Sequence, residues 1–330
     1  MGCSTIGISI ILALGMRAAP LAADAQPLTK VYRIGWLTAD TSPPSPSSAP
    51  KAFLQGLREL EYVEGQNLVI ESRYAEWRVE LLPALAADLV RLKVDVIVVG
   101  TPTAIFAATQ ATTTIPIVIY AAMHPVDAGL VARMARPGNN ITGVRTQLLE
   151  LNGKWLEWLK EAVPHVSRVA VLRNPSAPGA ADVFQEVQRV AQALGVELQS
   201  LEVRSPDAFE SAFDAATREG ARALLMLPAL LCNANEGQLA ALAVKSRLPA
   251  IFWRRGLAEA GGLMPYGPRE PDLLRRVAVL VDQILRGAKP GDLPIEQPMR
   301  FELVLNLKTA EALGLTLPPH LLVLADEVIQ

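Results

Sequence analysis

The chain has 330 residues, of which 51% are hydrophobic and 19% charged, and its formal net charge is −2 at pH 7. This charge gives no electrostatic case for a nucleic-acid partner, so we expect none. The chain contains 2 cysteines, Cys3 and Cys232, and 3 histidines. So few thiols and imidazoles exclude a multi-disulfide framework and disfavour a metal site, and we expect no metal and no cofactor.

The chain begins with the features of a secretory signal peptide. An apolar run, Ile6–Met16, is followed by small residues that end in Ala23-Asp24-Ala25. The run is too short to cross a bilayer as a helix, and the Ala-x-Ala sequence is typical of cleavage after Ala25. We therefore expect residues 1–25 to be a signal peptide and the protein to be periplasmic. An uncleaved anchor is the alternative, because no Lys or Arg precedes Ile6.

After this segment, short apolar runs alternate with amphipathic helical stretches. Near-continuous Val/Ile runs such as 94–99 are typical of strands that are covered on both faces of a parallel sheet. A first series of strand-helix units ends near Val144. We expect its strands over 31–37, 68–72, 94–99, 115–120 and 141–144, and its helices over 53–60, 80–92 and 126–134.

A second, similar series follows, and a short C-terminal remainder comes after it. The fold class that this pattern predicts is α/β, with two doubly wound parallel-sheet lobes. The remainder is too small for a third domain, so we expect it to pack back on both lobes. The predicted strands are 169–172, 196–201, 223–227, 250–253, 263–266 and 301–305, and the helices are 154–162, 182–194, 207–217 and two that carry Leu239 and Leu273, before a helical C-terminus.

Ligands of open α/β sheets bind beyond the carboxyl ends of the strands, so the loops at those ends are the candidate site. In one of them, Thr101 suits the cap of the next helix and Pro102 its first position. The exposed N–H groups there would accept a carboxylate, although an ordinary cap explains the sequence as well. The candidate ligand-binding residues are Thr38, Thr101, Thr103, Tyr120, His124, Thr146, Asn174, Ser176, Ala229 and Trp253.

The sequence lacks the usual short motifs of catalysis. It contains no G-x-S-x-G elbow, no phosphate-binding G-x-x-x-x-G-K-[ST] loop and no H-E-x-x-H zinc motif. Paired carboxylates would be found by geometry and not by sequence. We therefore expect a binding protein and no enzyme.

Several segments carry a resemblance to a known family. They are GLRELEYVEGQN at 56–67, LPALAADLV at 82–90, ATTTIPIV at 111–118, RPGNNITGV at 136–144, AGGLM at 260–264 and FELVLNLKTA at 301–310. In this order they resemble the ABC transporter substrate-binding proteins related to tryptophan- and tyrosine-binding components. The resemblance covers the chain from about Val31 to its C-terminus.

The resemblance implies a type I periplasmic binding protein, whose two lobes are joined by a three-segment hinge and close on a ligand. The implied hinge segments are 144–146, 253–256 and 286–298. One lobe would then comprise 31–145 plus about 256–286, and the other 146–255 plus about 287–330. Lobe closure would present a surface to a membrane permease, which is the expected partner of a monomeric protein.

The resemblance also implies a ligand class. In some relatives, hydroxyls matching Thr101 and Thr103 and an amide matching Asn174 hold an amino acid. Relatives often carry Asp at the positions of His124 and Ala229, and both losses remove a counter-charge for an ammonium group. Our hypothesis is therefore an aromatic or small organic carboxylate, or a neutral compound, in preference to a standard amino acid.

Two other classes of function stay open at this stage. A periplasmic sensor that signals without transport needs the same cleft and closure. A two-lobed, cofactor-independent isomerase commonly places paired cysteines or acid-base residues across its cleft, and the lack of a partner for Cys232 disfavours it.

Overall fold

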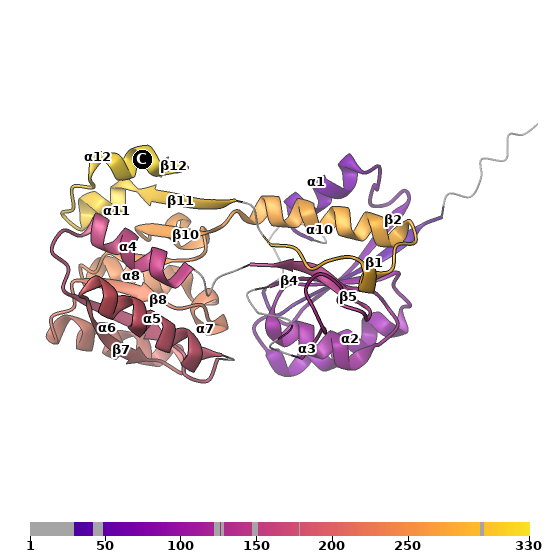
Figure 1. Cartoon of the computed structure of the whole chain (residues 1–330), viewed down its shortest axis with the longest axis horizontal. Helices are drawn as coiled ribbons and strands as arrows, with labels where there is room; N and C mark the ends of the chain where they lie inside the picture. Colours follow the sequence, from indigo (N-terminus) through magenta and orange to yellow (C-terminus); the bar gives the residue numbers. More distant parts are fainter. Residues whose placement is uncertain are drawn as a thin grey trace, which may run out of the picture. The chain divides into compact units, whose positions relative to one another are not determined.

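The chain forms two β-sheets covered by helices, as the computed structural model in Figure 1 shows. The structure describes residues 30–41, 49–121, 126, 129–146, 151–177, 179–297 and 300–330. The predicted signal peptide lies outside these residues. Among them, no helix combines the length and the apolar character needed to cross a membrane.

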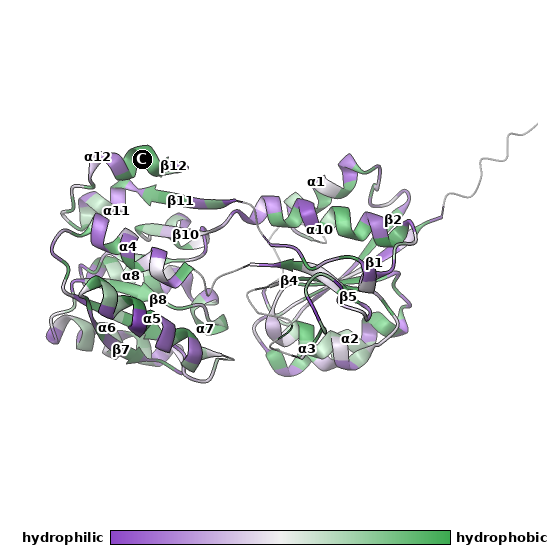
Figure 2. Cartoon of the chain, in the orientation of Figure 1, coloured by the Kyte–Doolittle hydropathy of each residue, from purple (hydrophilic) through white to green (hydrophobic). Residues whose placement is uncertain are grey.

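The first sheet has the order β2-β1-β3-β4-β5, and all its strands are parallel. Every residue of the Val96–Val99 strand is buried, which explains its unbroken apolar sequence. Figure 2 shows the strands of both sheets as largely hydrophobic, while the helices also carry polar residues. The strands are β1 (Tyr32–Thr38), β2 (Leu68–Tyr74), β3 (Val96–Val99), β4 (Ile117–Ala121) and β5 (Ile141–Arg145), and the helices between them are α1 (Lys51–Glu59), η1 (Val79–Leu81), α2 (Leu82–Arg91) and α3 (Pro102–Ala111).

The second sheet has the order β12-β11-β10-β9-β8-β6-β7 and is parallel except between β10 and β11. The two-lobed α/β prediction is therefore confirmed. The strands are β6 (Arg168–Arg173), β7 (Glu197–Glu202), β8 (Ala223–Met226), β9 (Ala250–Phe252), β10 (Met264–Pro268), β11 (Phe301–Asn306) and β12 (Glu327–Ile329). The helices are α4 (Asn152–Ala162), α5 (Ala180–Leu194), η3 (Pro206–Ala208), α6 (Phe209–Arg218), α7 (Leu230–Asn233), α8 (Glu236–Lys245), α9 (Gly256–Glu259), α11 (Leu307–Ala312) and α12 (Pro319–Leu324).

The C-terminal remainder returns to both lobes, as predicted. Helix α10 (Glu270–Leu285) packs against α1 of the first lobe, whereas β10, β11 and β12 belong to the second sheet. Gly56 permits the close approach of the two helices, because a Cβ there would lie 2.9 Å from the Cβ of Ala278. Leu273, Leu274, Val277 and Val281 of α10 complete the core of the first lobe.

The segment after α10 also stays with the first lobe. It contains η4 (Pro290–Asp292), and the Thr142 hydroxyl donates a 3.0 Å hydrogen bond to the Leu293 carbonyl. The Glu296 N–H donates to the Gly143 carbonyl at 2.8 Å, and the Arg145 N–H donates to the Glu296 carbonyl at 2.9 Å. Residues 287–296 thus extend along β5.

Three predictions about connections need correction. Residues 256–268 belong to the second lobe, because β10 pairs with β9, and residues 287–296 belong to the first. The middle crossing between the lobes is at Arg269, between β10 and α10, and not at 253–256. An apolar run indicates that a segment is a strand but does not indicate which sheet the strand joins. This explains why the lobe boundaries were predicted wrongly.

The helix predicted over 126–134 is also wrong where the structure describes it. Residues 129–134 form turns and irregular backbone, and Gly129 takes a φ of 70°, which interrupts helical conformation. Val131 is nevertheless buried in the first lobe. The apolar spacing therefore marked inward-facing residues without specifying a helix.

Candidate functional site

The carboxyl end of β1 carries an ordered acidic residue. The Thr38 hydroxyl donates a 2.8 Å hydrogen bond to Oδ2 of Asp40 and accepts one of 3.3 Å from the Asp40 N–H. Thr38 is buried, with 1% of its surface exposed. The predicted site residue Thr38 therefore orients Asp40, which the sequence analysis did not select.

The loop between β3 and α3 carries two buried hydroxyls without hydrogen bonds. Among the described residues, neither Oγ1 of Thr101 nor Oγ1 of Thr103 has a partner. Thr101 occupies the N-cap position, but its side chain makes no capping hydrogen bond, so the predicted side-chain cap is wrong. Pro102 stands in the first turn, as predicted. Unsatisfied buried hydroxyls beside free helical N–H groups are suited to an anionic or hydrogen-bonding ligand group.

Tyr120 lies directly against this loop. Its hydroxyl oxygen is 2.3 Å from the position that a Cβ on Gly100 would occupy, so the glycine makes room for the phenol ring. The ring also contacts Trp36, at a centroid distance of 5.3 Å. Burial raises the pKa of Tyr120 well above its usual value, so the phenol is a neutral hydrogen-bonding group.

The remaining predicted residues follow β5 of the first sheet and three strands of the second. Oγ1 of Thr146 and Nε1 of Trp253 are buried and lack partners among the described residues. Asn174 accepts a 2.9 Å hydrogen bond from the Ser176 N–H, and the exposed Ser176 hydroxyl accepts one of 2.7 Å from Arg204. Ala229 is buried at the start of α7. His124 lies outside the described residues.

Charged residues form a cluster near the ends of β1 and β9 and the starts of α8 and α10, and the sequence analysis missed most of it. Arg254 follows Trp253, and its Nε lies 3.4 Å from Oε1 of Glu236 in α8. Glu270 at the start of α10, Asp40 and Tyr120 all interact electrostatically with the Arg254 guanidinium. Electrostatic interactions of Arg254 therefore link the second lobe with residues of the first.

The environment shifts the pKa values of this cluster. Burial raises the pKa of Glu236, and Arg254 opposes that shift. Burial also raises the pKa of Glu270, with Arg254 lowering it and Asp40 raising it. Burial alone would lower the pKa of Arg254, but Glu236, Glu270 and Asp40 raise it above its usual value. Glu270 is nevertheless exposed to solvent, and solvent weakens the effect of burial on its pKa.

One sequence signal could have found this cluster. Each charged residue lies within a few positions of the carboxyl end of a strand or at the start of a helix, where ligand sites of α/β folds occur. Their proximity depends on the pairing of strands, which periodicity does not reveal.

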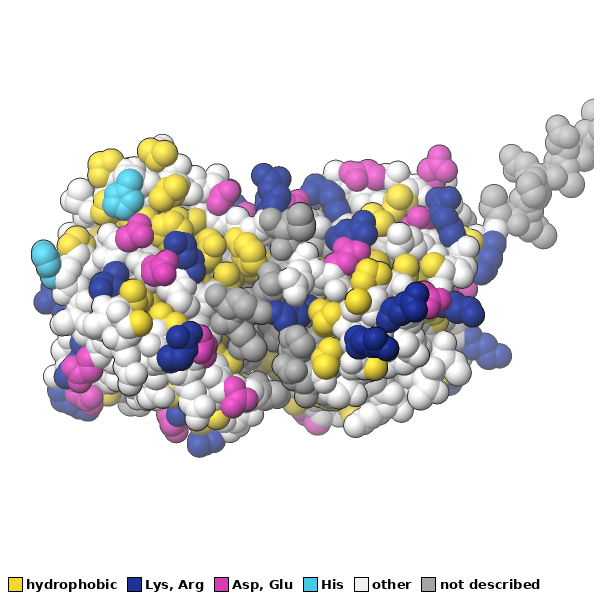
Figure 3. Space-filling view, in the orientation of Figure 1, with side chains coloured by type: hydrophobic (Ala, Val, Ile, Leu, Met, Phe, Trp, Pro, Cys, Tyr) yellow, Lys and Arg dark blue, Asp and Glu magenta, His cyan; other side chains and the backbone are white. Residues whose placement is uncertain are grey.

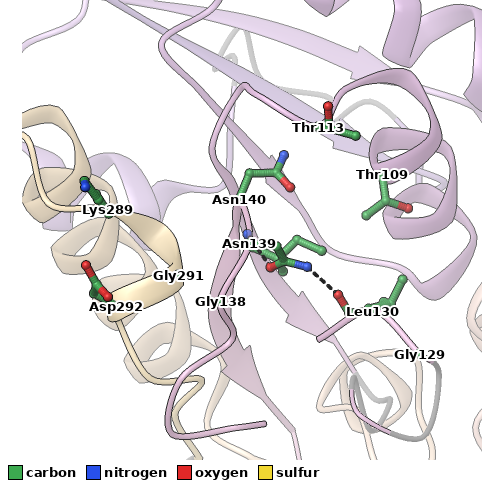
Figure 4. A pocket seen from close by; sticks show the side chains of 11 residues that line it. Thr109, Thr113, Gly129, Leu130, Gly138, Asn139, Asn140, Lys289, Gly291 and Asp292 are labelled. Carbon is green, nitrogen blue, oxygen red and sulfur yellow. Dashed lines mark hydrogen bonds between the residues drawn. The ribbon is translucent and has the colours of Figure 1, made fainter. Parts of the chain in front are cut away.

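A separate cavity lies near the amino end of β5, away from the carboxyl ends of the strands. It has a volume of about 530 Å³ and is shown in Figure 4. Its wall includes Thr109 near the end of α3, Ile141 at the start of β5, and Lys289. Nδ2 of Asn139 donates to the Leu130 carbonyl at 2.6 Å, as Figure 4 shows. Nδ2 of Asn140 donates to the Ile115 carbonyl at 2.7 Å. Because these amides already have partners, the cavity is a weaker candidate than the strand ends.

Comparison with known proteins identifies the family of the chain. Residues 38–329 match the model of a family described as ABC transporter substrate binding protein. The chain belongs to that family. Substrate-binding proteins of ABC transporters are extracytoplasmic, and the family is one of solute-binding proteins.

The chain is 26% identical, over 274 residues, to a protein of Clostridioides difficile named "Tyrosine-binding protein", covering 82% of this chain and 78% of the relative. It is 25% identical to a Streptococcus pneumonia protein solved in complex with L-Trp. That match has a TM-score of 0.81 and covers 91% of this chain and 100% of the other. A Vibrio cholerae structure, at 24% identity, TM-score 0.81 and the same coverage, shares the fold.

The chemistry of the strand ends suits this family. Among the described residues, no group of three or more His, Cys, Asp or Glu is arranged to hold a metal ion. The site instead combines unsatisfied hydroxyls, an indole, a phenol and a charged cluster. Groups of these kinds are suited to orienting a small polar ligand by hydrogen bonds and charge.

Proposed function

We propose that the protein is the solute-binding component of an ABC importer and captures a small organic ligand between its two lobes. The ligand is aromatic or carboxylate-bearing and amino-acid-like. The observation that supports this most strongly is the set of buried hydroxyls on Thr101, Thr103 and Thr146 without partners among the described residues. A buried polar group without a hydrogen bond costs free energy, and a ligand would supply the missing partners.

The relatives support the same ligand class. One is named for tyrosine and another was solved with L-Trp. Thr101 and the backbone at the start of α3 would receive a carboxylate, while Trp253 and Tyr120 would contact an aromatic or aliphatic body. Asn174 would add a hydrogen bond from the second lobe.

The proposal includes export to the periplasm, cleavage after Ala25 and delivery of the ligand to a membrane permease. The three connections between the lobes, which follow β5, β10 and Glu296, would act as the hinge. N-terminal sequencing of the exported protein should begin at Gln26. A first residue at Met1 would refute cleavage without affecting the binding proposal.

A thermal-shift screen tests the binding proposal directly. The exported protein is heated with amino acids, aromatic acids, amines and neutral aromatic compounds. A ligand at a hundredfold excess over its Kd stabilises the folded state by about 2.7 kcal/mol. We expect at least one compound to raise the Tm, and Thr101→Val to reduce that shift. If no compound in these classes raises the Tm, the proposed ligand class is wrong.

Uptake measurements test the transport role. Deletion of the gene should abolish accumulation of the identified ligand in cells. Normal uptake together with a lost transcriptional response would instead indicate a sensor.

A further inference from the structure

The charged cluster at the strand ends has more negative than positive groups. It contains the carboxylates of Asp40, Glu236 and Glu270 and one guanidinium, that of Arg254. Arg254 lies closest to Glu236, at 3.4 Å, and both residues belong to the second lobe. The Glu236 carboxylate is thus paired with Arg254, and the carboxylates of Asp40 and Glu270 remain without an ion pair among the described residues.

The two remaining carboxylates belong to the first lobe. Asp40 accepts a hydrogen bond from Thr38, and Glu270 opens α10. Neither makes an ion pair with any Lys, Arg or His that the structure describes. The internal segments outside the described residues, 42–48, 122–125, 127–128, 147–150, 178 and 298–299, contain no Lys or Arg, and His124 is their one basic side chain.

A second observation, at the ends of the neighbouring strands β3 and β4, also points to a ligand. Tyr120 interacts electrostatically with Asp40, Glu270 and Arg254, and its hydroxyl lies over Gly100. Thr101 follows Gly100 directly, has only 7% of its surface exposed, and has no partner for its hydroxyl among the described residues. An unsatisfied buried hydroxyl thus lies next in sequence to the glycine that the Tyr120 ring covers, and the same phenol interacts electrostatically with both carboxylates.

We propose that Asp40 and Glu270 bind a cationic group of the ligand, such as an ammonium, and thereby determine specificity. This inference rests on the proposed solute-binding function. The two carboxylates would supply the counter-charge that is missing at the positions of His124 and Ala229. A cation between the two carboxylates would relieve their mutual repulsion. The carboxylates would in turn balance the charge of a cation that loses part of its hydration on binding.

The electrostatics of Glu270 give the proposal a pH signature. The groups that act on it are Arg254, Asp40 and Glu259, and it faces the neutral phenol of Tyr120. Burial raises its pKa in the unliganded protein, so on acidification protonation of Glu270 competes with a bound cation. A cationic ligand would displace that proton, and its affinity would rise with pH until Glu270 is fully ionised. A carboxylate-only ligand would show the opposite trend.

Three probes that share one ring system test the proposal by calorimetry. They are L-tryptophan, tryptamine and indole-3-propionate, which carry both charges, only the ammonium, and only the carboxylate. The proteins are the exported wild type, Glu270→Gln, Asp40→Asn and the control Glu259→Gln. Glu259 is a suitable control because it is exposed and its Oε1 lies 2.9 Å from Nε of Arg255.

We expect the ammonium-bearing probes to bind better than indole-3-propionate. Glu270→Gln should weaken their binding about tenfold or more, as for a hydrogen bond to a charged group, whereas Glu259→Gln should change it less than about twofold. The Tm of unliganded Glu270→Gln should not fall, which separates loss of a ligand contact from loss of folding.

Two outcomes overturn the proposal in distinguishable ways. If indole-3-propionate binds best and Glu270→Gln leaves all affinities unchanged, the cationic specificity is wrong but the solute-binding function stands. If none of the three probes binds and the broad thermal-shift screen finds no ligand, both proposals fail.

Discussion

The Tyr62 hydroxyl donates a 2.9 Å hydrogen bond to Oδ1 of Asp282 and thereby ties the loop after α1 to α10. Both residues are buried, with 6% and 8% of their surfaces exposed. The same carboxylate oxygen accepts a 2.6 Å hydrogen bond from Nε of Arg286. This polar contact fixes α10 on the first lobe, although 220 positions separate Tyr62 and Asp282 in the sequence.

Replacing Tyr62 by Phe should destabilise the protein by about 1.5–3 kcal/mol, because it removes a hydrogen bond to a buried charged group. The difference should depend on pH. Burial and the hydrogen bond to Asp282 raise the pKa of Tyr62 to about 12. The resulting stabilisation is present below about pH 10, the pKa of the unfolded tyrosine, and is lost as the pH rises toward 12. Urea unfolding from pH 7 to 11.5 measures both effects, and a constant difference would contradict this account.

Replacing Gly56 by Ala should destabilise the protein by about 1–3 kcal/mol through overpacking between α1 and α10. The new Cβ would meet the Cβ of Ala278 at 2.9 Å and the Arg275 backbone at 3.2 Å. Gly237→Ala in α8 is the matched control, because nothing lies within 4 Å of its Cβ position. That change should be neutral or stabilise the helix by up to about 1 kcal/mol. Thermal unfolding of the two variants gives the comparison, and equal effects would argue against tight helix packing.

Replacing Thr101 by Val should leave the stability of the unliganded protein nearly unchanged, because its hydroxyl has no partner among the described residues. Affinity for an identified ligand should fall about tenfold if a ligand carboxylate accepts a hydrogen bond from that hydroxyl. Thr142→Val supplies the opposite control, since its buried hydroxyl donates to the Leu293 carbonyl at 3.0 Å. That variant should lose stability and keep its affinity. Calorimetry and urea unfolding on both variants would detect any departure from this pattern.

The two glutamates Glu270 and Glu327 should affect the pH dependence of stability in opposite directions. The raised pKa of Glu270 means that its contribution is favourable below the unfolded pKa and is lost as the pH rises through the folded pKa. The hydrogen bond from Arg255 lowers the pKa of Glu327, so its contribution is present at neutral pH and lost on acidification.

Tm measurements between pH 4 and 8 test this contrast in the unliganded protein. Relative to wild type, Glu270→Gln should gain stability as the pH rises, and Glu327→Gln should lose it. Parallel Tm curves for the two variants would show that the assigned environments are wrong.

The face drawn in Figure 3 carries charges of both signs, whereas the cluster around Arg254 has more acidic than basic groups. Lys and Arg side chains are interspersed there with Asp and Glu, as expected for a chain of net charge −2. Composition therefore gave no indication of the local acidic excess around Arg254.

The sequence by itself determined the alternation of strands and helices and the two-lobed fold class. These follow from apolar periodicity, which is local: Val96–Val99 had to be a buried strand, and Leu273, Val277 and Leu280 had to share one helix face. The local sequence also marked Thr101 and Trp253 as residues at strand ends.

Only the tertiary structure decided which strand ends meet. The pairing of β10 with β9 moves the crossing between the lobes to Arg269, and the return of α10 to the first lobe brings Glu270 near Asp40 and Arg254. The interaction of Glu270 with Asp40 joins residues 230 positions apart, and all these relations depend on the free energy of burying whole surfaces. No short window of sequence contains that information. This is why the prediction from sequence considered a counter-charge only at the positions of His124 and Ala229, and did not consider Glu270.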